Sequence, residues 1–217
     1  MLKENGLPIV DLIKTIHHYY PIGLLNEEAT AHYPGYQELC LLLERKINDI
    51  INNNLPEHCY KLFIQLKEQF SNQKFTVFDE NYLQFPAYSY RINISEIQIE
   101  NFRIITDIKI KISNLASYYT IFKEITIFDR VAPLGQTSER LAMYVIINKV
   151  DDMELAGICD TINNFFSGYE YLDHRLLMNI KITGGVPHGL QHLDKITFPI
   201  YSFLFDNYLE FVNHIVK

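Results

Sequence analysis

The feature that most constrains the fold is a regular alternation between residues 102 and 112. The even-numbered positions are apolar or β-branched: Phe102, Ile104, Thr106, Ile108, Ile110 and Ile112. The odd-numbered positions are mostly polar: Arg103, Asp107, Lys109 and Lys111. Because neighbouring strand residues point to opposite faces, this pattern predicts an antiparallel strand with one wet face. We expect Ile108 and Ile110 in the core and Lys109 and Lys111 in solvent, since a one-residue shift would reverse every side chain.

The alternation changes phase just before this strand. Tyr90, Ile92 and Ile94 are even-numbered, whereas Ile97 and Ile99 are odd-numbered. Each change of phase predicts a turn or a β-bulge, because the apolar side chains otherwise leave the buried face. The segment therefore indicates strands joined in series.

Four further strands are expected after residue 112. They are 118–128, 141–150, 169–172 with a possible extension through 176–182, and 196–205. The first has β-branched and aromatic residues on both faces, which predicts a central or partner-covered strand. Gly184 and Gly185 interrupt the third, and Pro199 places the start of the last at a sheet edge.

Helical spacing of apolar residues predicts three helices in the first third, at about residues 8–20, 37–51 and 55–70. Asp151 followed by Glu154 resembles a capping box and predicts a fourth helix, with Gly168 as its C-terminal cap. Asn207 and Glu210 indicate a short C-terminal helix that includes Ile215.

The order of these elements predicts an α+β fold. An N-terminal helical layer, residues 1–73, precedes a mainly antiparallel sheet with one long helix packed on it, residues 74–217. The two segments can equally form one continuous domain. With 217 residues and 48% hydrophobic composition, the chain is long enough and apolar enough for a packed core.

Charge and cysteine content narrow the classes of function. The formal net charge of -7 argues against non-specific nucleic-acid binding and suits a basic partner. Cys40, Cys59 and Cys159 are widely spaced, which favours reduced thiols over a disulfide framework. The N-terminal residues lack the apolar run of a secretory signal, and no segment approaches the roughly 20 apolar residues of a membrane span. We therefore expect a cytoplasmic protein with no membrane partner.

Catalytic motifs are missing from the sequence. His188 and His192 would share a face on a helix, but glycines at 184, 185 and 189 favour a loop, and the glutamate of a zinc-protease motif is absent. Cys59 follows His58, yet adjacent helical side chains diverge. We expect no catalytic residue, metal or cofactor. The alternative is an enzyme of unknown class whose site is assembled around His188 and His192.

A mixture of aromatic and acidic residues is the best candidate for a partner-binding surface. Aromatic side chains provide anchoring area, and acids steer a basic partner. The candidates are Tyr118, Tyr119, Glu124, Asp129, Asp151, Asp152 and Glu154. If the strand 118–128 lies inside the core, its members are structural instead.

One stretch resembles a known group of proteins. Three segments are similar to the strand, helix and F-x-G-Y strand of immunity proteins from bacterial polymorphic-toxin systems: the run from Tyr144 to Leu155, the helix after it, and Asn164-Phe-Phe-Ser-Gly-Tyr-Glu-Tyr-Leu172. Tyr118-Tyr119-Thr-Ile-Phe resembles another strand of that group. The resemblance covers roughly residues 115–175 and implies a non-enzymatic cytosolic protein that binds and neutralises a cognate toxin. A structural or adaptor protein that assembles through its N-terminal helices remains a further alternative.

Overall fold

The computed structural model of the chain describes residues 8–23, 30–81, 85–131, 140–191, 196–207, 209 and 213–216. Within these ranges, the side chains of residues 129–131, 140–144 and 213–214 are not described. The architecture is α+β, as the order of the predicted elements indicates.

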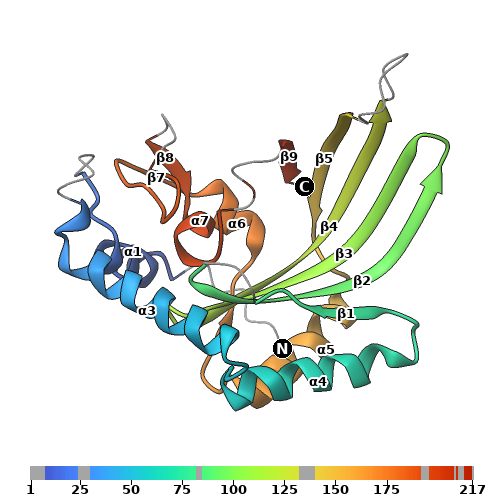
Figure 1. The fold of residues 1–217 in the computed structure, drawn as a ribbon, viewed down its shortest axis with the longest axis horizontal. Coiled ribbons are helices and arrows are strands. Elements are labelled where there is room, and N and C mark those ends of the chain that lie inside the picture. The colour runs from blue at the N-terminus through green and yellow to red at the C-terminus, as the bar shows by residue number, and fades with distance from the viewer. Residues whose placement is uncertain are drawn as a thin grey trace.

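A strongly curved sheet forms the centre of the molecule (Figure 1). Its strands are β1 (Thr76–Asp79), β2 (Ala87–Ile99), β3 (Phe102–Ser113), β4 (Tyr118–Val131), β5 (Arg140–Asn148), β6 (Glu170–Tyr171) and β9 (Asn213–Val216). Strands β1 to β5 are antiparallel neighbours in chain order, whereas β9 lies parallel to β5 and β6 parallel to β4. The prediction of a mainly antiparallel sheet is confirmed.

The phase changes in the sequence correspond to irregularities in the backbone. The register of β2 against β3 shifts between Asn93 and Ser95, as the first phase change predicts. The second falls in the turn between β2 and β3, where Glu100 has a positive φ of 48°. Both predictions are confirmed, because a bulge or turn moves the apolar side chains back to one face.

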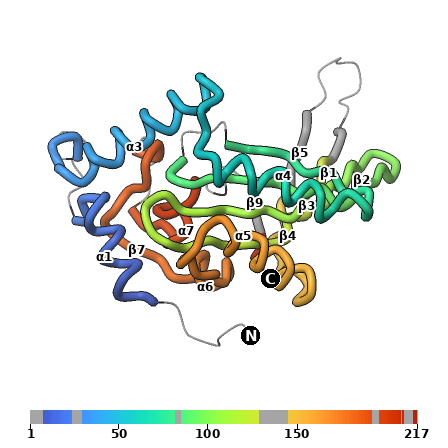
Figure 2. Tube along the Cα trace, turned by 90° about the horizontal axis from the view of Figure 1, so that it is seen from below, coloured from blue at the N-terminus to red at the C-terminus, as the bar shows by residue number. Residues whose placement is uncertain are grey.

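Helices cover both faces of the sheet. They are α1 (Ile9–Tyr19), α3 (Pro34–Ile51), α4 (Glu57–Ser71), α5 (Asp152–Phe165), α6 (His174–Asn179) and α7 (Ile200–Leu204). Figure 1 shows α4 and α5 beneath the convex face, with α6 and α7 inside the curve. Figure 2, a view from below, shows α4 and α5 lying over the strands. The four predicted helices before residue 170 are confirmed, although the Asp151 side chain makes no capping hydrogen bond and the capping box is wrong.

The convex face of the sheet and α4 and α5 form one hydrophobic core. Ile108 and Ile110 are fully buried there, as the alternation predicts. The hydroxyl of Tyr90 donates to the backbone oxygen of Cys59 at 3.1 Å and ties the sheet to α4. Burial raises the pKa of the Cys59 thiol to about 12, so this sulfur stays protonated in the interior.

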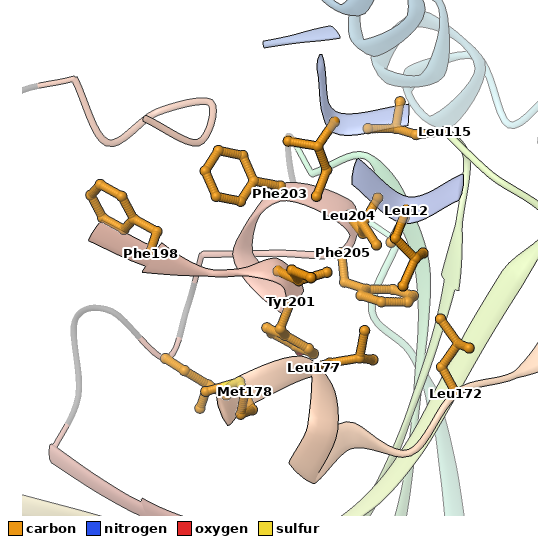
Figure 3. Close-up of a cluster of buried hydrophobic side chains, with 14 of the residues drawn as sticks. Leu12, Leu115, Leu172, Leu177, Met178, Phe198, Tyr201, Phe203, Leu204 and Phe205 are labelled. Atoms are coloured by element: carbon orange, nitrogen blue, oxygen red, sulfur yellow. The ribbon is translucent and has the colours of Figure 1, made fainter. Parts of the chain in front are cut away.

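A second core fills the concave side. All five residues of α7 are buried, and four of them belong to this core: Ile200, Tyr201, Phe203 and Leu204. Figure 3 shows Tyr201, Phe203 and Leu204 within it. The hydroxyl of Tyr20, which follows α1, donates to the backbone oxygen of Phe203 at 2.9 Å. The two predicted segments, 1–73 and 74–217, thus both contribute residues to this core, as they do to the core on the convex side.

Three predictions for the part of the chain after residue 175 are wrong. The proposed strand 176–182 is helix α6 followed by a short strand, β7 (Lys181–Thr183). The proposed strand 196–205 is β8 (Thr197–Pro199) and then α7, because Pro199 ends the strand and stands at the N-terminus of the helix. Residues 213–216 form strand β9 rather than a helix. In the part of the chain that the structure describes, no helix is long and apolar enough to cross a membrane.

Candidate functional site

The predicted partner-binding residues do not form one surface. Tyr119 is buried under α5, where its hydroxyl lies 3.5 Å from Asn163 Oδ1. Glu124 is buried on the opposite face of the sheet, since residues 119 and 124 of one strand point to opposite sides. Tyr118 is half-buried against the concave core. These three side chains are therefore structural in the isolated chain.

The other four predicted residues lie elsewhere. Asp151, Asp152 and Glu154 are together at the start of α5, where Asp151 and Asp152 are exposed and Glu154 is half-buried. Asp152 forms an ion pair with Lys149, with 2.6 Å between the carboxylate Oδ1 and the ammonium nitrogen. Asp129 is in β4, but its side chain lies outside the described residues.

The concave face of β2, β3 and β4 carries a buried network of charges. Lys111, which the alternation predicts to be wet, is only 6% exposed. Its ammonium lies 2.9 Å from Asp206 Oδ2 and 3.2 Å from Ser89 Oγ. Lys109 lies 3.2 Å from Glu80 and 3.6 Å from Glu124. The prediction of solvent-exposed lysines is wrong for both residues, since the Lys109 side chain is only 13% exposed. The chain supplies acids that replace water around these cations.

The protonation equilibria of this network follow from its burial. Burial raises the pKa of the Glu124 carboxyl, and the nearby Lys109 and Lys111 act against that shift. Burial acts to lower the pKa of Lys111, but the carboxylates of Asp206, Glu80 and Glu124 together outweigh it and the pKa is raised. Charges that compensate one another in this way are typical of structural ion-pair networks as well as of functional sites.

No element of the described part of the chain covers an apolar band on the distal half of the convex face. We call it the convex band and define it as Ile97, Ile99, Phe102, Ile104, Ile125, Ile127, Ile146 and Ile215. The strand register places these side chains on the same face as buried Ile108, since Ile97 is opposite Ile104 and Ile104 is opposite Ile127. Ile97, Ile99, Phe102 and Ile215 are 41% to 60% exposed, and the other four are half-buried. None of the eight belongs to either core.

Acidic residues border the convex band at one side. Strand β5 leaves the sheet two residues after Ile146 and leads into α5 on the same convex face. The first turn of α5 presents Asp151 and Glu154 together with Met153, whose side chain is 89% exposed. An apolar surface next to acids is the composition of an interface for a basic partner.

A groove of about 480 Å³ lies at the other end of α4 and α5. One wall is a stripe of α3 at helical spacing: Glu38, Leu41, Leu42, Arg45, Lys46 and Asp49. The facing wall is largely aromatic and consists of His58, Tyr88, Asn114, Phe166 and Tyr169. The ring centroid of Phe166 lies 4.8 Å from that of His58 and 5.2 Å from that of Tyr169, so the three rings form one continuous wall.

His188 takes part in a structural network. Its Nδ1 lies 3.0 Å from the hydroxyl of Tyr36 in α3, and Gln191 donates to the same hydroxyl at 2.7 Å. Asn207 donates to the backbone oxygen of His188 at 2.9 Å. These bonds join the loop to α3 and to the segment after α7. His192 lies outside the described residues, and no group of three potential metal ligands occurs within them.

The residue pattern contains a signal for the convex band that sequence reasoning missed. Ile97 and Ile99 continue an apolar face beyond the bulge, but α4 has only 15 residues and cannot cover strands of 12 to 14 residues along their whole length. The helix is about 22 Å long, whereas the strands span about 40 Å. Comparing these lengths would have indicated an uncovered apolar end.

Comparisons of the chain with protein-family models, with curated proteins and with solved structures found no match. The geometry and the sequence resemblance therefore carry the functional argument.

Proposed function

We propose that this chain is a non-enzymatic binding protein that neutralises a partner protein, in the manner of an immunity protein against a bacterial toxin. The observation that carries the proposal is the convex band, because contiguous exposed apolar patches on soluble proteins mark interaction sites. The resemblance of residues 115–175 to immunity proteins supports the same class.

The chemistry of the partner follows from the border of the band. Asp151 and Glu154 belong to no ion pair among the described residues, so both carboxylates are available to a basic group. Together with the net charge of -7, they favour a partner that presents an apolar surface flanked by lysine or arginine. Met153 and the exposed isoleucines would supply the desolvated centre of such an interface.

The test is growth rescue and co-purification in a heterologous bacterium that expresses this gene with each neighbouring open reading frame. We expect one neighbour to be toxic alone, to be neutralised by this chain, and to co-purify with it. The Ile99→Glu and Phe102→Glu variants should lose both properties, because each buries an unpaired charge in the interface.

A matched control is Val10→Glu, which places the same charge on an exposed residue of α1 outside the band. It should retain rescue. If no neighbour is neutralised or co-purified while the protein is folded, the proposal is wrong. Full rescue by both band variants would instead remove the convex band from the interface.

A further inference from the structure

Four charged side chains of α3 line the groove, and two of them, Arg45 and Asp49, have no partner among the described residues. The other two, Glu38 and Lys46, are engaged. Glu38 is held by His18 Nε2 at 2.9 Å. Lys46 donates to the backbone oxygens of Phe85, at 2.9 Å, and Ala87. Arg45 and Asp49, one helical turn apart, belong to no ion pair or side-chain hydrogen bond among the described residues. The exposed Arg45 and the half-buried Asp49 therefore line the groove as neighbouring opposite charges, and among the described residues neither has another charged partner.

Aromatic faces lie opposite this pair. Phe166 is 4% exposed and forms the base of the wall, and the rings of His58 and Tyr88 lie beside it. Such rings hold a planar apolar group by edge-to-face or offset stacking. The volume of the groove falls in the range of about 300 to 1,000 Å³ that is usual for small-molecule sites.

We propose that the groove binds a free α-amino acid with an aromatic side chain. The Arg45 guanidinium would pair with the carboxylate through two N–H groups, and the Asp49 carboxylate would accept from the ammonium. The ring would pack against Tyr88 and His58, with the buried Phe166 ring beneath them. Only a ligand that carries both charges compensates both groups at once; a cation alone faces Arg45, and an anion alone faces Asp49.

Two further observations agree with a ligand site. Burial lowers the pKa of the Lys46 amine to about 8, and perturbed amines are enriched at functional sites. The groove lies at the N-terminal end of α4 and the C-terminal end of α5, whereas the convex band borders the N-terminal turn of α5. The two sites are separate, so this inference does not depend on the proposed function.

The experiment is calorimetric titration of the full chain with four probes. They are L-phenylalanine, D-phenylalanine, 2-phenylethylamine, which lacks the carboxylate, and 3-phenylpropionate, which lacks the ammonium. One phenylalanine enantiomer should bind at least about tenfold more tightly than either single-charge probe, because hydrogen bonds to charged groups are stronger than those between neutral groups. The two enantiomers should differ, since a three-point contact of two charges and a ring is chiral.

Matched variants assign the contacts. Arg45→Gln should reduce phenylalanine affinity to that of 2-phenylethylamine, and Asp49→Asn should reduce it to that of 3-phenylpropionate. Arg103→Gln, which changes an exposed arginine of the β2–β3 hairpin, should leave the affinity for phenylalanine unchanged. Equal affinity for all four probes, or no heat at millimolar phenylalanine, would overturn the proposal. If a variant fails to fold, the probe series on the unaltered chain still decides.

Discussion

Ile110 and Ile99 belong to the same apolar face of the sheet, yet α4 and α5 cover only the first. We expect Ile110→Ala to lower the free energy of unfolding by about 2 to 5 kcal/mol, because it removes buried methyl groups and leaves a cavity. Ile99→Ala is the matched control: its side chain is 51% exposed, so the loss should stay within about 0.5 kcal/mol. Urea denaturation of both variants checks the pair, and equal losses would contradict the burial difference.

His174 has a specific effect on acid stability. It is 1% exposed, and its ring lies 5.6 Å from that of Phe122. Neither ring nitrogen has a hydrogen-bond partner among the described residues. Burial lowers the pKa of His174 from 6.5 to about 4; Asp173 acts to raise it and Arg175 to lower it. The folded chain therefore keeps this imidazole neutral where the unfolded chain protonates it.

The direction of the pH dependence follows from proton binding. Between pH 6.5 and about 4 the unfolded state binds the extra proton, so acidification through this window favours unfolding. We expect wild-type stability to fall over that range by on the order of 2 kcal/mol more than the stability of His174→Leu. The measurement is urea midpoints at several pH values. The pKa of Glu124 is raised, so this residue favours folding on acidification. Its contribution is the same in both proteins and cancels in the comparison. Parallel stability profiles of the two proteins would contradict the prediction.

At the scale of elements, periodicity predicted the segments that have one apolar and one polar side. α3, α4 and β3 each show such a pattern, and each is confirmed. The segment 200–205 is buried on every side, so its apolar residues carry no helical or strand period. That is why α7 was predicted as a strand.

The same reasoning explains the error at the charged face of β3. Alternation predicts which side chains share a face, and Lys109 and Lys111 do share one. It does not reveal that residues as distant as Glu80 and Asp206 approach that face and pair with the lysines. The candidate groove was equally invisible in the sequence, since its walls combine α3 with residues up to 131 positions further along the chain.

At the scale of the whole molecule, electrostatic steering should govern how fast the proposed basic partner binds. Reversing the charges at Asp151 and Glu154 to Lys should slow association and weaken its dependence on salt, because long-range attraction acts before contact. Asp11→Lys, an exposed acid of α1, is the control and should have a smaller effect. Stopped-flow or surface-based kinetics with the neutralised partner at several salt concentrations provide the test. A change confined to the dissociation rate would show that these acids act within the contact instead of steering.

The hydrogen bond between Tyr20 and Phe203 spans 183 positions of the chain. During synthesis, α1 leaves the ribosome long before α7 exists, so the concave core cannot close until residues 200–204 have emerged. Strands β2, β3 and β4, which pair with their neighbours in sequence, can form their ladder earlier. The nascent chain would then have an incomplete sheet, with the convex core assembled and the apolar side chains of the concave core still exposed. Chaperone demand should therefore be greatest in the last stage of translation.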